Sequence, residues 1–261
     1  MNTTLITIFG TLFIFFCTTL GASVVYFFKK QISPKFSTLI LGFAAGIMIS
    51  ASIWSLLLPA IEQSKSWGNF KFVPAVVGFF LGGIFLTLMD KFVPNFQPKD
   101  TQNAKNADFG RLLKLFVAIT VHNIPEGLAV GFAFGVARSS GAPAAYLTAL
   151  GLAIGIGLQN IPEGTAVSLP IKSITGSRNK AFLYGMASGA VEPVFALVGY
   201  FLASSLVCVQ PWILAFAAGT MIFVVAEELI PEAKLEDHPH FGTWGVMLGF
   251  ALMMILDVVM A

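Results

Sequence analysis

Eight long apolar stretches, separated by short polar segments, constrain the fold of this chain more than any other feature. They span residues 5–28, 38–61, 72–92, 112–137, 145–170, 181–207, 211–232 and 242–260. Each is close to the roughly 20 residues that an α-helix needs to cross a bilayer. Strands of a membrane barrel would be shorter and would alternate polar with apolar residues. We therefore expect an all-α, polytopic membrane protein with eight transmembrane helices.

The composition of the 261-residue chain excludes most other classes of protein. Hydrophobic residues make up 56% of the chain and charged residues only 11%, whereas soluble domains carry about 25% charged residues. This deficit excludes a disordered chain, a nucleic-acid-binding domain and almost any soluble enzyme. The net charge of +2 is too small to attract a polyanion, so no nucleic-acid partner is expected. Cys17 and Cys208 lack CxxC spacing, which predicts neither a disulfide framework nor a thiolate metal site.

The positions of Lys and Arg predict the orientation of the chain, because basic residues gather in the cytoplasmic loops of membrane proteins. Only Lys65, Lys71 and Arg138 lie on one side of the predicted crossings. The other twelve basic residues lie in the first, third, fifth and seventh loops, and they are Lys29, Lys30, Lys35, Lys91, Lys99, Lys105, Arg111, Lys114, Lys172, Arg178, Lys180 and Lys234. This distribution predicts extracytoplasmic termini in a multi-pass protein of the cell inner (plasma) membrane.

A single membrane domain is expected over residues 1–261. The first basic residue is Lys29, so the N-terminus lacks the basic region of a secretory signal, and residues 5–28 are expected to be retained as a helix. The longest linker, residues 93–111, is polar and contains proline. It predicts a flexible cytoplasmic loop between the third and fourth helices.

Acidic residues, unlike the basic ones, occur inside the predicted helices. An ionised acid at mid-bilayer costs about 2.5–3.5 kcal/mol even on the milder insertion scales. Without basic partners, such groups must be protonated, hydrated or neutralised by a bound cation. Helix capping, or hydrogen bonding as neutral acids, is the alternative for any one of them. Several such acids, some of them in shared motifs, instead indicate an interior that receives positive charge. The acids within the predicted helices are Glu126, Glu163, Glu192, Glu227, Glu228 and Asp257.

The strongest local signal is a hexapeptide that occurs twice, as HNIPEG at residues 122–127 and as QNIPEG at residues 159–164. Five of the six positions are identical. The predicted fourth and fifth helices run in opposite directions, so the two copies are antiparallel. Related segments of opposite direction are typical of an inverted repeat, whose substrate site lies near the midplane of the membrane.

The spacing within the motif places ligand types together. Residues four apart share a helix face, so His122 faces the same way as Glu126, and Gln159 the same way as Glu163. The prolines inside the motifs remove backbone hydrogen bonds and predict a kink in each helix. Imidazole, carboxylate and amide oxygen together suit Zn²⁺, Fe²⁺, Mn²⁺ and similar ions. A lone histidine would fit a polar contact between helices equally well, but the repetition favours a metal site.

The pair HNIPEG and QNIPEG, in consecutive helices of an eight-helix chain, resembles the ZIP family of divalent-metal transporters. The glutamine of the second copy is similar to the GufA-type prokaryotic branch. The resemblance covers essentially the whole chain and implies three, two and three helices with an inverted repeat. It further implies a transporter, not an enzyme, that moves Zn²⁺ foremost, and also Fe²⁺, Mn²⁺, Co²⁺ and Cd²⁺, into the cytoplasm. The metal is then the transported substrate, and no cofactor is expected.

The resemblance also implies the residues of a binuclear metal site between the fourth, fifth and sixth helices. The implied ligands of the main transport site are Met48, His122, Glu126, Gln159 and Glu163. The implied neighbouring site is completed by Asn123, Asn160 and Glu192, with Glu126 and Glu163 as bridges. Along the pathway, Glu62 matches an entrance acid, Asp257 is similar to an acid of some members, and the exit-side cluster corresponds to Glu227, Glu228 and Glu232.

Two departures from the family pattern modify these expectations. Residues 93–111 contain no histidine, although many ZIP proteins carry a His-rich loop there, so a metal-sensing role of this loop is not expected. Gln159 stands where other branches have histidine. The site is then richer in oxygen, which is expected to broaden its selectivity towards harder ions.

Glycines at small-xxx-small spacing predict close helix packing that would also allow helices to slide. They include the pairs Gly42/Gly46, Gly78/Gly82, Gly127/Gly131, Gly185/Gly189 and Gly245/Gly249. The family resemblance implies an elevator-like motion of helices one, four, five and six against the other four. It also implies a homodimer, for which the sequence offers no specific interface motif.

Two other functions share some of these features. An intramembrane metalloenzyme would use the metal to activate water, but the chain lacks the H-E-x-x-H spacing expected of a catalytic zinc protein. A metal-selective channel would share the acidic lining. Metal flux into sealed liposomes without an organic substrate separates the enzyme from both transport functions.

Overall fold

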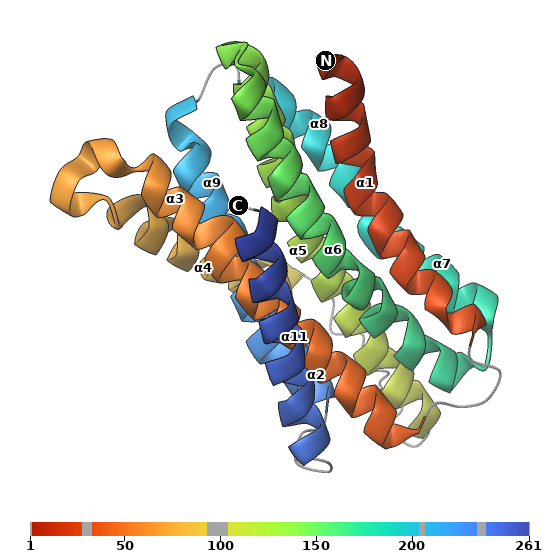
Figure 1. The fold of residues 1–261 in the computed structure, drawn as a ribbon. Helices are drawn as coiled ribbons and strands as arrows, with labels where there is room; N and C mark the ends of the chain where they lie inside the picture. The colour runs from red at the N-terminus through yellow and green to blue at the C-terminus, as the bar shows by residue number, and fades with distance from the viewer. Residues whose placement is uncertain (1, 28–32, 93–103, 204–206, 234–238, 261) are drawn as a thin grey trace.

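A computed structural model describes residues 2–27, 33–92, 104–203, 207–233 and 239–260, and every regular element within these ranges is a helix (Figure 1). The elements are α1 (Thr3–Ser23), α2 (Pro34–Ala51), a π-helix (Ser52–Leu57), α3 (Leu58–Gln63), α4 (Val73–Phe92), α5 (Ala104–Ser140), α6 (Pro143–Thr175), α7 (Arg178–Gly189), α8 (Val191–Ala203), α9 (Gln210–Val224), a second π-helix (Val225–Leu229), α10 (Ile230–Glu232) and α11 (Pro239–Met260). Short 3₁₀-helices cover Val24–Tyr26, Lys65–Phe70 and Val207–Val209.

Seven helical stretches of the described chain are long and apolar enough to cross a bilayer. They are Thr3–Tyr26, Pro34–Gln63, Phe116–Ser140, Pro143–Thr175, Arg178–Ala203, Gln210–Leu229 and His240–Val259. The predicted third crossing forms α4, whose apolar part, Val73–Met89, is shorter. The all-α class predicted from the apolar stretches is therefore confirmed, and the described residues contain seven candidate membrane spans.

Local sequence signals explain where several helices begin and end. The Ser33 hydroxyl accepts a hydrogen bond from the Phe36 backbone N–H, and Pro34 occupies the first helical turn of α2. Ser177 caps α7 in the same way through the Lys180 N–H. Gly176 ends α6 at a φ of 66°, in the left-handed region that a residue without Cβ adopts easily.

The prolines differ in whether the helix around them continues, breaks or changes to a π-helix. Pro125 and Pro162 lie inside the continuous helices α5 and α6, because a buried helix tolerates the lost hydrogen bond when neighbouring groups satisfy the freed carbonyl. The sixth predicted crossing breaks at Ala190, between α7 and α8, ahead of Pro193. The two π-helices end shortly before Pro59 and Pro231.

The predicted flexible loop 93–111 is covered only in part. Residues 93–103 lie outside the described residues, and residues 104–111 belong to the start of α5. The extension has a local cause, since the segment AKNADFGR contains only one residue, Gly110, that strongly disfavours a helix.

The helices form two bundles, which lie side by side in Figure 1. The first bundle contains α1, α5, α6, α7 and α8, with α1 packed on α6 and α5 packed on α8. The second bundle contains α2, α3, α4, α9 and α11, with α2 packed on α11 and α4 packed on α9. The bundles meet mainly where α5 contacts α9 and where α6 contacts α2.

Glycine allows the closest helix contacts, and these lie within each bundle. A Cβ at Gly131 of α5 would lie 1.8 Å from the Ala196 carbonyl oxygen of α8. A Cβ at Gly46 of α2 would lie 2.0 Å from the Val246 carbonyl oxygen of α11. All five predicted glycine pairs contact helices of their own bundle. These stripes therefore fix helices together inside a bundle and are not faces along which the bundles slide.

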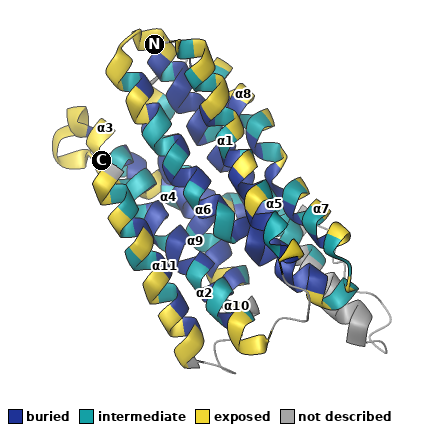
Figure 2. Ribbon diagram, turned by 45° about the vertical axis from the view of Figure 1, so that its right-hand side comes forward, coloured by how far each residue is buried: buried dark blue, intermediate teal, exposed yellow. Residues whose placement is uncertain are grey.

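Figure 2 shows exposed residues along outer helices such as α11 and buried residues towards the centre, and many of the exposed residues are apolar. Leu12, Phe80, Leu197 and Leu252 are each more than 40% exposed and come from α1, α4, α8 and α11. A soluble protein would place such residues inside, whereas a bilayer solvates them. The centre of the molecule instead contains the polar residues described next.

Candidate metal centre

Three helices of the first bundle bring the polar residues of the duplicated motif to one buried location. Residues of α5, α6 and α8 contribute side chains that are at most 1% exposed. They are His122, Asn123, Glu126, Gln159, Asn160, Glu163 and Glu192. The helical period explains the convergence within each helix, because the motif residues at positions one and five share a face.

His122 lies between two carboxylates, one from each copy of the motif. Its Nε2 atom is 3.6 Å from Glu126 Oε1 and 3.5 Å from Glu163 Oε2. One ligand atom from each of the three residues lies within 4.8 Å of the other two. This is the geometry of groups that can share a single metal ion.

The two copies of the motif contact one another reciprocally. His122, the first residue of one copy, approaches Glu163, the fifth residue of the other. Gln159, the first residue of the second copy, donates from Nε2 to Glu126 Oε1 at 2.7 Å. Each helix therefore provides an acid for the opposite helix.

Glu192 forms a second cluster beside the first. Its Oε1 accepts a hydrogen bond from Asn123 Nδ2 at 3.3 Å, and its Oε2 accepts one from Asn160 Nδ2 at 3.0 Å. The Thr18 hydroxyl of α1 also donates to Oε1, at 2.8 Å. Three donors therefore converge on the two carboxylate oxygens of Glu192.

Eight buried side-chain atoms of this centre lack a hydrogen-bond partner among the described residues. They are both ring nitrogens of His122, Asn123 Oδ1, Glu126 Oε2, Gln159 Oε1, Asn160 Oδ1 and both carboxylate oxygens of Glu163. Six of these atoms are oxygens of carboxyl or amide groups, and all eight belong to groups that can bind a metal ion. Leaving such a group unsatisfied costs about 1–3 kcal/mol, and a cation satisfies several acceptors at once. The donor set therefore fits a divalent metal ion.

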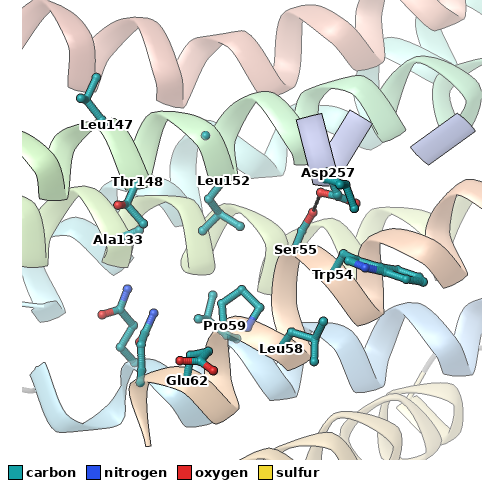
Figure 3. A pocket seen from close by; sticks show the side chains of 15 residues that line it. Trp54, Ser55, Leu58, Pro59, Glu62, Ala133, Leu147, Thr148, Leu152 and Asp257 are labelled. Carbon is teal, nitrogen blue, oxygen red and sulfur yellow. Dashed lines mark hydrogen bonds between the residues drawn. The ribbon is translucent and has the colours of Figure 1, made fainter. Parts of the chain in front are cut away.

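A cavity of about 740 Å³ lies between the two bundles and is lined by residues from both of them (Figure 3). Its walls include Ser55 and Glu62 from the α2–α3 stretch, Thr148 from α6 and Asp257 from α11. Ser55 and Asp257 point toward each other in Figure 3, and the hydroxyl donates to Asp257 Oδ1 at 2.5 Å. Asp257 Oδ2 is buried without a hydrogen-bond partner in the described structure. We call this cavity the vestibule.

The remaining predicted site residues come from helices other than α5, α6 and α8. Met48 is buried in α2, 1% exposed. Glu62 is exposed at the end of α3 and forms an ion pair with Lys65. Glu227 and Glu228 lie in the second π-helix, so Glu228 and Glu232, four residues apart, lack the regular α-helical spacing that places such residues on one face. The side chain of Glu232 lies outside the described part of the chain.

Thr18 and Ser55 were not among the predicted site residues, although each donates to a predicted acid. Neither lies in a motif. A threonine or serine inside an apolar helix usually bonds to the carbonyl four residues earlier, and Thr18 is also 3.2 Å from the Ile14 carbonyl oxygen. Such a residue gives no sequence signal for a contact with a distant helix.

Replacing Thr18 by valine is expected to lower the thermal stability of the protein. The shape is conserved, but Glu192 loses one of its three buried hydrogen bonds, and a typical hydrogen bond contributes about 0.5–1.5 kcal/mol. Thr19→Val is the matched control, because the Thr19 hydroxyl donates only to the Phe15 carbonyl of its own helix in the described structure. Thermal unfolding in detergent measures both, and equal melting temperatures would contradict the role of Thr18.

Comparison with known proteins identifies the family. A family model described as a ZIP zinc transporter matches residues 4–113 and 109–257. The chain belongs to the ZIP family. The resemblance predicted from the two hexapeptides is thereby confirmed, and membership identifies the chain as a transporter and not an enzyme.

Relatives of the ZIP family match this chain over most of its length. "Zinc transporter ZIP11" of Xenopus tropicalis is 35% identical, and the match covers 95% of each chain. "Zinc transporter ZIPB" of Bordetella bronchiseptica is 37% identical over 93% of this chain and 77% of the relative. "Zinc transporter GufA" of Myxococcus xanthus is 34% identical over 88% of this chain and 89% of the relative. The similarity to prokaryotic members agrees with the branch predicted from Gln159.

Proposed function

We propose that this ZIP family member carries divalent transition-metal ions, Zn²⁺ foremost, into the cytoplasm by alternating access. Fe²⁺, Mn²⁺, Co²⁺ and Cd²⁺ are further substrates. The observation that carries the proposal is the group of buried side-chain atoms around His122, Glu126 and Glu163 that have no hydrogen-bond partner among the described residues. The names of the relatives as zinc transporters support the choice of Zn²⁺.

In this proposal the centre holds two ions. The main transport site consists of His122, Glu126, Gln159 and Glu163, with Met48 as a thioether ligand. The neighbouring site uses the unpartnered carbonyl oxygens of Asn123 and Asn160 together with Glu192, and Glu126 and Glu163 bridge the two. The amide nitrogens of both asparagines already face Glu192, which supports a role of their oxygens towards a cation.

The proposed topology has eight crossings in a 3+2+3 arrangement with an inverted repeat, extracytoplasmic termini and a location in the cell inner membrane. In this topology α4 is the third crossing along the chain and brings the total to eight, because its 20 residues are long enough to span a bilayer. The reciprocal contacts between the two motif copies support the inverted repeat. The distribution of Lys and Arg supports the orientation.

Alternating access is proposed to occur by movement of one bundle past the other, with the main site carried by the first bundle. Backbone contacts at glycine hold each bundle together. At the interface, by contrast, a Cβ at Gly155 would meet side-chain atoms, the nearest being Ser55 Oγ at 3.1 Å. Side-chain contacts reform after a displacement more easily than interlocked backbones. This division favours a carrier with an elevator-like motion rather than a fixed channel. A homodimer remains a prediction.

The proposed path begins in the vestibule and ends at the second π-helix. Glu62 and Asp257 place carboxylates at the vestibule, where they raise the local concentration of cations. Glu227, Glu228 and Glu232 receive the ion on the cytoplasmic side. A π-helix widens the helical turn and often marks a functional site.

Asp257→Asn is expected to raise the KM for Zn²⁺ about three- to tenfold with a smaller change in kcat. The substitution keeps the shape of the side chain but removes a charge that contributes about 1 kcal/mol per unit charge at 4 Å even in water. Uptake measured at low ionic strength tests this. Ser55→Ala is the matched control, because it removes the hydrogen bond and keeps the charge. An equal effect of both changes would assign the role to the hydrogen bond instead.

The proposed function is tested by metal uptake into sealed proteoliposomes without an organic substrate. A competition series of Zn²⁺, Fe²⁺, Mn²⁺, Co²⁺ and Cd²⁺, repeated across pH, is expected to show saturable uptake with Zn²⁺ among the best substrates. Absence of flux for every ion would contradict transport. Uptake that never saturates would favour a channel.

A further inference from the structure

A second repeated segment lies in the second bundle. Residues 43–49 of α2 read FAAGIMI and residues 216–222 of α9 read FAAGTMI, so that six of seven positions are identical. The two helices run in opposite directions (Figure 1). Like the hexapeptides of the first bundle, these segments are related copies of opposite direction, one in each half of the chain.

The two copies have the same local structure and the same kind of helix contact. A Cβ at Gly46 would lie 2.0 Å from the Val246 carbonyl oxygen of α11, and one at Gly219 would lie 2.0 Å from the Phe79 carbonyl oxygen of α4. A π-helix begins four residues after the methionine of each copy, at Ser52 and at Val225. The two methionines, Met48 and Met221, are 1% and 0% exposed. They therefore occupy equivalent positions in the second bundle.

Met221 reaches the metal centre of the first bundle. Its sulfur is 3.8 Å from Gln159 Nε2, and the same nitrogen donates to Glu126 Oε1 at 2.7 Å. Gln159 thus connects the thioether to a carboxylate of the centre. Gln159 Oε1 and Glu126 Oε2, the other oxygens of these two side chains, have no hydrogen-bond partner within the described residues.

We propose that Met221 is a thioether ligand of the transported ion and the counterpart, in the second repeat, of Met48. Rotation of the Gln159 amide by half a turn exchanges its nitrogen for its oxygen. The ion then gains the amide oxygen, and the sulfur lone pair no longer accepts the N–H. Thioether sulfur is a soft ligand, so Met221 favours Cd²⁺ and Zn²⁺ over Mn²⁺. This inference rests on the proposed transport function.

A weak ligand suits the position of Met221. The sulfur belongs to α9 of the second bundle, whereas Gln159 and Glu126 belong to the first. Any movement of one bundle past the other must break a bond between Met221 and the ion. A neutral thioether binds weakly and needs no proton to dissociate, so it contributes selectivity without holding the ion at the interface.

Uptake of Cd²⁺ and Mn²⁺ by Met221→Leu proteoliposomes tests the proposal. The swap conserves volume, which cores tolerate well. The KM for Cd²⁺ is expected to rise about tenfold, a typical effect for a group that tunes a metal site, while the KM for Mn²⁺ changes less than about twofold. Met253→Leu is the matched control, since Met253 is a buried methionine, 1% exposed, on α11. An unchanged ratio of the two KM values, or an equal rise for both ions, would overturn the proposal.

X-ray absorption of the Cd²⁺-loaded protein provides a readout that does not depend on transport. The measurement uses a background of Cys17→Ala and Cys208→Ala, so that any bound sulfur comes from methionine. Met48→Leu is expected to retain a Cd–S signal, and the further change Met221→Leu is expected to abolish it. Loss of the signal in Met48→Leu alone would overturn the role of Met221. If Cd–S is present but the wild type moves no metal, the transport function fails and the ligand assignment stands.

Discussion

Glu163→Ala is expected to reduce Zn²⁺ uptake at least about 100-fold without loss of the fold. Glu163 Oε2 is 3.5 Å from His122 Nε2, and even groups that only orient a metal ligand are worth about 10–100-fold in affinity. Both carboxylate oxygens are buried and lack hydrogen-bond partners among the described residues. Their removal therefore leaves no donor unsatisfied, and the melting temperature without metal is expected to be equal or higher.

Glu126→Ala is expected to abolish uptake as well, but at a cost in stability. Glu126 accepts the Gln159 amide at 2.7 Å, so its removal leaves a buried donor without its partner. Comparing the two variants separates metal binding from folding. Asp108→Ala serves as a control, because Asp108 lies in α5 but outside the span Phe116–Ser140. Retention of Zn²⁺ and Cd²⁺ uptake within a few-fold in folded Glu163→Ala would disprove the metal site.

The second large effect concerns the packing inside the first bundle. Gly131→Ala is expected to destabilise the protein by about 3 kcal/mol or more, at the upper end of overpacking effects. The added Cβ would lie 1.8 Å from the Ala196 carbonyl oxygen, and a backbone oxygen of a packed helix cannot rotate away as a side chain can. The contact is relieved only if α5 and α8 move apart.

Gly151→Ala provides the matched control for Gly131→Ala. Gly151 is also inside a long helix, α6, but an added Cβ meets no described atom within 4 Å. Alanine there is expected to raise the melting temperature slightly, since alanine favours a helix over glycine by about 0.5–1 kcal/mol. Thermal unfolding in detergent compares the two variants. A Gly131→Ala protein as stable as Gly151→Ala would show that the bundle is not held together by this contact.

The two predictions concern separate parts of one mechanism. The Glu163→Ala variant tests whether the first bundle carries the ion, and the Gly131→Ala variant tests whether that bundle is a rigid unit. A carrier needs both properties, because an ion bound to a bundle that deforms would not be exposed alternately to the two sides.

The sequence predicted the chemistry of the centre and the helical class of the fold. The contact of His122 with Glu126 follows from the helical period, which is a local property. The repeated hexapeptide predicted that two helices supply the same groups to one centre, and the structure brings His122 to Glu163. Length and apolarity predicted eight crossings, and seven of them match candidate spans of the described chain.

Only the tertiary structure decided which helices are neighbours. In a bilayer, a residue facing lipid and a residue facing another helix are equally apolar, so hydrophobic patterning does not identify partners. The glycine stripes predicted close packing but not that each stripe stays within its own bundle. The contacts of Thr18 with Glu192, Ser55 with Asp257 and Met221 with Gln159 join residues far apart in the chain. Such contacts depend on the relative positions of whole helices, which no local period of the sequence records.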